Sequence, residues 1–221
     1  MEKTELRAKF EKSGRAIFIS HLDLMRTMQR AMKRSGIPVW YTQGFNPRIY
    51  LNFPLALSLG ITGRAEFMDF AVVEPTDLAE AKERLNGAMP EGLKILDVAE
   101  PVYANKDVGF AEYSIDFYSS AEPSEMLSIL DKMLAEDKIE ADKHSKKKGT
   151  VKVDIKPHIN ILTTELADGF LRVAVRLPAG LALNINANVF TDAFAEYSKL
   201  QFTRICAERT KILCTNGENF R

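Results

Sequence analysis

The sequence predicts an α+β protein made of two tandem ferredoxin-like domains, each with the split βαβ order of elements and an antiparallel sheet. Segments with strand alternation are interspersed with segments of helical periodicity along the whole chain. Their order is β-α-β-β-α-β in the first half, and the second half repeats this order with one added strand. The length of 221 residues suits two domains of about 100 residues each. The alternative is one continuous α+β domain with a shared sheet.

The first half, a predicted domain over residues 1–104, has its clearest signals near its start. Residues 4–11 alternate apolar and charged side chains, which is typical of a strand with one buried face. Ser20 suits a helix N-cap and Gly36 suits the position after a helix, so we expect a helix over 20–35. Further elements are expected as strands at 39–42, 66–73 and 93–99, a loop at 43–48 and a helix at 75–88.

The second half, a predicted domain over residues 105–221, repeats the same kinds of element. Asp168-Gly169 is a turn sequence between two apolar alternating segments, which predicts a β-hairpin. The expected elements are strands at 110–118, 151–155, 159–163, 170–177 and 202–213, with helices at 123–135 and 188–200.

The overall composition excludes several classes of protein. Lys plus Arg and Asp plus Glu are 30 each, so the chain is not a bulk polycation of the histone kind. No apolar run approaches the roughly 20 residues that a membrane-spanning helix needs, so we expect no membrane association. Cys206 and Cys214 are too few for a disulfide framework, which favours the reducing cytoplasm.

The charge is nevertheless unevenly distributed. Residues 1–50 carry ten Lys or Arg and four Asp or Glu, residues 51–140 are acidic, and residues 141–160 are again basic. Segregated basic segments indicate local anion-binding patches, although solvated helix faces would give the same pattern.

The helix expected at 20–35 separates into an apolar and a basic face when its residues are placed at about 100° intervals. Leu24, Met28 and Ala31 fall on the apolar face. His21 falls on that side too, in the first turn, where we expect it to meet the Gly44–Arg48 loop. It is there either a ligand-facing acid or base or a half-buried structural histidine. The opposite face offers either phosphate contacts or merely a solvated surface, and its cations are Arg26, Arg30, Lys33 and Arg34.

The loop that follows combines residue types found in RNA-binding sites. Tyr41 and Phe45 are candidates to stack on bases, Gln43 and Asn46 to read base edges, and Arg48 to hold a phosphate. The same loop could instead be a structural crossover with its aromatic rings in the core. A second basic cluster contributes three further candidates for phosphate binding or for simple solubility, Lys146, Lys147 and Lys148.

Other chemistries lack their motifs in this sequence. Two cysteines cannot supply an iron–sulfur cluster, and the three histidines lack the spacing of a metal site, so no metal site is expected. Gly60-Ile61-Thr62-Gly63 is neither a Walker sequence nor a dinucleotide fingerprint, and no Gly-x-Ser-x-Gly elbow occurs.

Several motifs together resemble the radical-SAM-linked family, a bacterial domain of unknown function found alone or fused to B12-binding-type radical SAM proteins. The resemblance covers most of the chain and is most specific in the first 60 residues. It implies a radical SAM protein as partner, which would carry the iron–sulfur cluster and SAM, with no cofactor in this chain. The matching motifs are FISHLDLMR at 18–26, QRA at 29–31, GIP at 36–38, QGFNPR at 43–48, KG at 148–149 and VDIKP at 153–157.

A more distant resemblance is to the CRISPR repeat-processing endoribonucleases, which have tandem ferredoxin-like domains and a histidine on the first helix. The lysine and tyrosine that complete such a site have no assigned counterpart here. We therefore expect an RNA-binding accessory module that acts with a radical SAM partner on tRNA, rRNA or another structured RNA. Two alternatives stay open: a metal-independent endoribonuclease that uses His21 as acid or base, and a protein-interaction domain that docks the partner through the acidic 61–140 segment.

Overall fold

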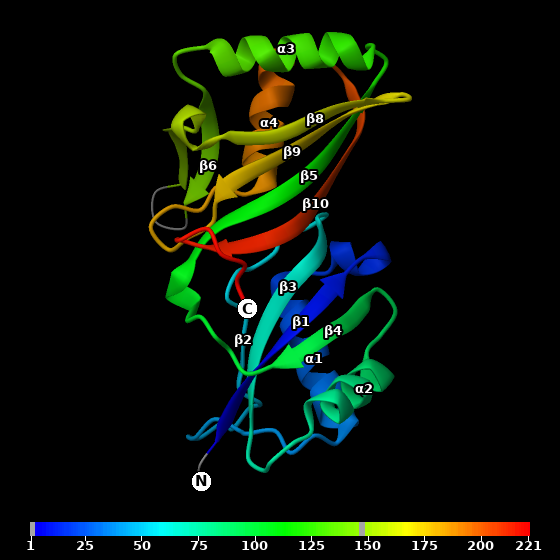
Figure 1. Ribbon diagram of the computed structural model, residues 1–221, viewed down its shortest axis with the longest axis vertical. Helices are drawn as coiled ribbons and strands as arrows, with labels where there is room; N and C mark the ends of the chain where they lie inside the picture. The colour runs from blue at the N-terminus through cyan, green and yellow to red at the C-terminus, as the bar shows by residue number, and fades with distance from the viewer. Residues whose placement is uncertain (1–2, 146–148) are drawn as a thin grey trace. The chain divides into compact units, whose positions relative to one another are not determined.

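The structure is a computed structural model that describes residues 3–145 and 149–221 (Figure 1). It is a mixed α and β fold in which the described residues form four α-helices and largely antiparallel strands. The chain divides into two compact units, which we call the first unit (Met1–Val108 with Lys211–Arg221) and the second unit (Gly109–Thr210). The finer assignment to domains 1–104 and 105–221 stays a prediction.

The first unit contains a sheet with the strand order β4-β1-β3-β2, in which every neighbouring pair is antiparallel. Figure 1 shows β4, β1 and β3 side by side. In chain order the elements are β1 (Thr4–Lys12), the 3-10 turn η1 (Gly14–Phe18), α1 (His21–Ser35), β2 (Leu51–Asn52), β3 (Thr62–Val72), α2 (Leu78–Ala88), β4 (Leu93–Ala99) and η2 (Asn105–Asp107).

The helix α1 forms where its caps and periodicity predict. The Ser20 hydroxyl accepts a hydrogen bond from the Asp23 backbone N–H at 3.1 Å, and Gly36 takes the left-handed conformation that ends the helix, with φ of 68°. Leu24, Met28 and Ala31 are buried, as the helical periodicity predicts, on the face of α1 that packs in the core of the first unit.

Side chains on α2 hold the C-terminal end of α1 in place. Arg84 donates through Nε to the Ser35 carbonyl oxygen at 2.9 Å and through Nη2 to the Gly36 carbonyl oxygen. In return, Arg34 of α1 donates to the carbonyl oxygen of Ala88 at 2.7 Å. These bonds satisfy carbonyl groups at helix ends that have no partner within their own helix. They fix α1, and the basic face it carries, against α2.

Two predicted elements of the first unit differ from those observed. Residues 39–42 form only isolated bridges, from Val39 to Val72 and from Tyr41 to Ile49, and the short strand lies later, at β2. The backbone groups of this segment pair with residues 48–50 instead of continuing along β3: the Thr42 N–H donates to the Arg48 carbonyl oxygen, and the Tyr50 N–H donates to the Trp40 carbonyl oxygen. The helix expected from 75 starts at Leu78, because the Asp77 carboxylate caps it by accepting from the Glu80 N–H at 2.8 Å.

The second unit has the strand order β10-β5-β9-β8, and a separate two-stranded sheet pairs β6 with β7. The β5–β9 and β8–β9 pairs are antiparallel. Its elements are β5 (Val108–Ser119), α3 (Pro123–Ala135), β6 (Glu140–Ser145), β7 (Gly149–Asp154), η3 (Lys156–His158), β8 (Asn160–Ala167), β9 (Phe170–Pro178), α4 (Ala187–Ser198) and β10 (Phe202–Cys214).

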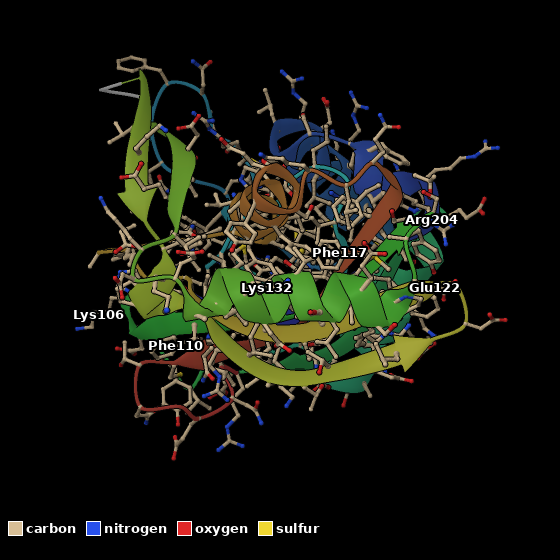
Figure 2. All side chains as sticks on the ribbon, turned by 90° about the horizontal axis from the view of Figure 1, so that it is seen from above. Lys106, Phe110, Phe117, Glu122, Lys132 and Arg204 are labelled. Atoms are coloured by element: carbon tan, nitrogen blue, oxygen red, sulfur yellow. The ribbon has the colours of Figure 1, made fainter. Side chains whose placement is uncertain are left out.

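The core of the second unit lies between its helices and one face of β5 and β9. Phe117 of β5, labelled in Figure 2, meets Phe194 of α4 edge to face at 5.0 Å between ring centroids. The helix α3 starts after Glu122 and carries Lys132 on an exposed position (Figure 2). The predicted Asp168-Gly169 hairpin is confirmed, with Gly169 at φ of 80° between β8 and β9.

One expectation for the second unit needs correction. The single added strand is instead a hairpin, because the strand expected at 151–155 pairs with β6, an element that was not predicted. The sequence of β6 is EADKHS, which holds a single small apolar residue, Ala141, so its alternation carries no hydrophobic signal. None of the helices formed by the described residues has the length and apolarity that a membrane crossing requires.

Candidate nucleic-acid interface

The outward face of α1 carries the four cations that the helical periodicity placed there. Arg26, Arg30, Lys33 and Arg34 are all exposed. Arg26 forms an exposed ion pair with Asp23 at 3.4 Å, and Arg34 is bonded to α2. The side chains of Arg30 and Lys33 form no hydrogen bond or ion pair with any residue that the structure describes, which leaves both cations available to an anion in solution.

The loop after α1 projects from the first unit. Its base is closed by two bonds, from the Thr42 N–H to the Arg48 carbonyl oxygen at 2.8 Å and from the Arg48 N–H to the Thr42 hydroxyl at 3.2 Å. At its tip Phe45 has a relative exposure of 105%, so the ring touches almost nothing in the unit. Gly44 has φ of 128°, a conformation that side chains disfavour. The other candidate loop residues, Tyr41, Gln43, Asn46 and Arg48, are exposed as well.

One hydrogen bond shows that the loop and the basic face lie on the same side of α1. Gln29 donates through Nε2 to the carbonyl oxygen of Ile49, one residue after the loop, at 3.2 Å. Positions 26, 29, 30 and 33 lie three and four residues apart and therefore share one face of the helix. Gln29 is three residues after Arg26 and four before Lys33, at one edge of that set, so the end of the loop lies along the edge of the basic face near those two positions. The sequence left this relation open.

His21 lies at the N-terminal end of α1, where it is an exposed residue and its ring meets Phe53 edge to face at 5.2 Å. Partial burial, and then the positive charge of Lys12, lower the pKa of His21 from its ordinary value. Lys12 is itself buried and its ammonium donates to the carbonyl oxygens of Ile17 and Ile19, each at 3.4 Å. Both effects favour the neutral form of the imidazole.

The position of His21 differs from the expectation in one respect. We expected it to meet the Gly44–Arg48 loop, and its ring contact is with Phe53 instead. The physical reason is that side chains of a helix lean toward its N-terminus. A residue in the first turn therefore reaches past the helix end, away from the middle of α1, where Gln29 holds the loop.

The remaining sequence candidates are three lysines and the possible metal ligands. Lys146, Lys147 and Lys148 lie outside the described residues. In the part of the chain that the structure describes, no three His, Cys, Asp or Glu side chains gather so as to hold a metal ion. Cys206 and Cys214 are free thiols.

A second aromatic and basic cluster, on the second unit, was missed in the sequence. Tyr118 and Phe170 stack at 4.9 Å between centroids, Arg172 lies over Phe170 at 5.1 Å, and Arg204 lies over Tyr118 at 4.1 Å (Figure 2 labels Arg204). These residues come from three strands, so no local motif unites them. The signal in the sequence that could have indicated this cluster is the occurrence of aromatic and basic residues at outward-facing positions of β5 and β9. Arg172 is held by Asp116 through two bonds, at 2.7 and 2.9 Å, so its charge is already compensated.

Comparison with known families identifies the chain at the level of its family. Residues 5–188 match the family described as "Uncharacterized protein conserved in bacteria (DUF2344)". The chain belongs to this family. The match spans α1, the loop and α3, and it ends at the start of α4. As its description says, DUF2344 is uncharacterized, and the family carries no activity over to this chain.

Two further comparisons add little. No curated protein is similar to the chain in sequence. Among solved structures, an unknown protein from Galdieria sulphuraria is 15% identical, with 95% of this chain and 99% of that chain covered at a TM-score of 0.28. A similarity this low supports no argument about fold or function.

Proposed function

We propose that this DUF2344 chain is an RNA-binding accessory module whose contact surface is the outward face of α1 together with the loop at 42–48. The observation that carries the proposal is the bond from Gln29 to Ile49, because it ties the loop that bears a fully exposed phenylalanine to a helix face with cations that have no carboxylate partner among the described residues. RNA has a binding partner for each part of this surface: its phosphates pair with the cations, and its unstacked bases stack on the exposed ring.

The residues of this surface divide into two roles. Arg30 and Lys33 hold phosphates through charge, with Arg26, Arg34 and Arg48 at the margins. Phe45 stacks on a base, and Tyr41, at 42% exposure, offers a second ring at the base of the loop. The neighbouring amides, Gln43 and Asn46, are in position to bond base edges.

The proposal includes a radical SAM protein as partner, which would hold the iron–sulfur cluster and SAM in the reducing cytoplasm. It rests on the resemblance of residues 18–48 to the radical-SAM-linked family. It also includes two tandem ferredoxin-like domains. The orders β4-β1-β3-β2 and β10-β5-β9-β8 support this part. If the added hairpin β6–β7 is left out, the strands of each unit lie in the order fourth, first, third, second along the chain, which is the order of a split βαβ unit.

A second candidate, a metal-independent endoribonuclease, is favoured by one observation. The lowered pKa of His21 makes the exposed imidazole a neutral base near pH 7. Incubation of RNA with the wild type and with His21→Ala separates the candidates. The accessory module leaves RNA intact in both samples, and an endoribonuclease cleaves it only with the wild type.

Fluorescence anisotropy of a labelled, structured RNA with single-stranded loops tests the main proposal. The double variant Arg30→Glu/Lys33→Glu should bind far more weakly, and the slope of log K against log salt should fall by about 0.7–0.9 for each phosphate that the variant no longer binds. Lys132→Glu, an exposed helix lysine of the second unit, is the matched control and should bind as the wild type does. Equal affinity for all three proteins at low salt would reject RNA binding here and favour the protein-interaction alternative.

A further inference from the structure

A corner built from two aromatic rings lies close to the start of β1. Trp40 and Tyr50 meet edge to face at 5.9 Å between centroids, and the Tyr50 N–H donates to the Trp40 carbonyl oxygen at 3.1 Å, which fixes the two residues together. The ammonium of Lys3 lies 4.8 Å from the Trp40 ring and 4.7 Å from the Tyr50 ring. The same ammonium is 2.8 Å from a carboxylate oxygen of Glu5. Two aromatic rings and a carboxylate thus surround one cation.

An open hollow adjoins this corner within the first unit. Its volume is about 360 Å³, and its lining includes Glu5 and Tyr50 along with Arg7, Asp69 and residues 101–105. Arg7 and Asp69 form a two-bond ion pair, at 2.6 and 3.0 Å, and their charges cancel. Glu5 is then the remaining charge of the lining, and Lys3 balances it. Without the Lys3 ammonium the corner and the hollow together would be anionic.

We propose that the Trp40, Tyr50 and Glu5 corner is a binding site for a weakly hydrated organic cation of the quaternary ammonium class, and that Lys3 occupies it in the free protein. Rings attract cations through their faces, and a carboxylate adds charge. A lysine ammonium is compact and strongly hydrated, so it loses more hydration in such a site than a trimethylammonium group does.

Release of Lys3 disturbs little else. Lys3 precedes the first strand residue, Thr4, so the departure of its side chain breaks no strand hydrogen bond. Burial, and then the charge of Glu5, raise the pKa of Tyr50, which keeps the phenol neutral and its ring intact as a cation-binding face at physiological pH. The body of a ligand larger than its ammonium group would extend into the hollow beside Tyr50. This proposal does not depend on RNA binding.

The fluorescence of Trp40 provides a direct test, since the chain has one tryptophan. Tetramethylammonium chloride should change the Trp40 emission in a saturable way, against sodium chloride at the same concentration as the reference. Lys3→Met should bind it about tenfold more tightly than the wild type, because the competing cation is removed from both rings. Lys94→Met, an exposed lysine on β4, should match the wild type.

Two further variants separate the site from a general effect on the protein. Glu5→Gln in the Lys3→Met background should weaken binding, and Tyr50→Leu should abolish saturation. Circular dichroism melting of each variant checks that the first unit stays folded, and Lys3→Gln replaces Lys3→Met if the latter melts early. A linear response in all proteins, or equal affinity for Lys3→Met and the wild type, would overturn the proposal.

Discussion

Two arginines on the sheet of the second unit and two cations of α1 in the first unit differ in whether a carboxylate already holds them. On the second unit, Arg172 is bonded twice to Asp116, and Arg176 is bonded to Glu112 at 2.7 and 3.1 Å. On α1 of the first unit, Arg30 and Lys33 have no such partner among the described residues. A guanidinium already held by a carboxylate must give up that bond before it can take a phosphate. A chain of zero net charge can therefore still reserve one surface for anions.

Burial should make the largest difference between ion pairs of the two units. Arg7 and Asp69 are 4% and 8% exposed, whereas Arg172 and Asp116 are 40% and 17% exposed. Asp69→Ala should lower the free energy of unfolding by about 3 kcal/mol or more, since it leaves a buried guanidinium without its carboxylate. Asp116→Ala should cost about 1 kcal/mol or less, because solvent screens that pair. Urea unfolding of both variants measures the difference, and equal losses would contradict it.

The exposed ring of the first unit should matter for RNA and not for stability. Phe45→Ala should weaken RNA binding by about 1–3 kcal/mol if the ring stacks on a base, with little change in the salt slope. Its melting temperature should stay that of the wild type, because the ring is not packed in the core. Phe170→Ala, in the aromatic cluster of the second unit, serves as the control and should leave RNA affinity unchanged. A loss of affinity confined to Phe170→Ala would move the interface to the second unit.

The smallest expected effect comes from His21, whose folded pKa is lowered. As pH falls below the ordinary histidine value of about 6.5, the unfolded chain takes up the proton first, so folding stability is lost. Above that value the group has no such effect. Between about pH 7.5 and 5.5 the wild type should therefore lose slightly more stability than His21→Gln. The effect is small because the ring is partly exposed. Urea titrations measure it, and a larger loss in His21→Gln would refute the lowered pKa.

Sequence patterns predicted those parts of the fold that depend on local chemistry. The residues that bury α1 follow from its periodicity, and the two that cap it, Ser20 and Gly36, act within one turn of its ends. The outward cations follow from the same periodicity. The hairpin at Asp168-Gly169 also follows from two adjacent residues. In each case the determining interaction lies within a few positions in the sequence, where a motif can be recognised.

Features that depend on distant residues escaped prediction. The hydrogen bond from Gln29 to Ile49 joins residues 20 positions apart, and no motif at either residue predicts it. The contact of His21 with Phe53, the pairing of β6 with β7, and the place of Lys3 beside Trp40 are of the same kind. Each of these contacts depends on how the chain folds back on itself. The sequence therefore predicts which residues belong to the candidate site, and only the fold shows which of them lie together.

Ultraviolet crosslinking to RNA in cells, followed by trypsin digestion and mass spectrometry, tests RNA binding by the first unit most directly. Trypsin cuts after Arg34 and Arg48, so the loop is released as one peptide, Ser35–Arg48, which holds both Tyr41 and Phe45. We predict that the crosslinked nucleotide maps to this peptide and that the signal falls in Arg30→Glu/Lys33→Glu. Crosslinks found only within residues 109–210, or equal signal in the variant and the wild type, would contradict RNA binding at the α1 face and its loop.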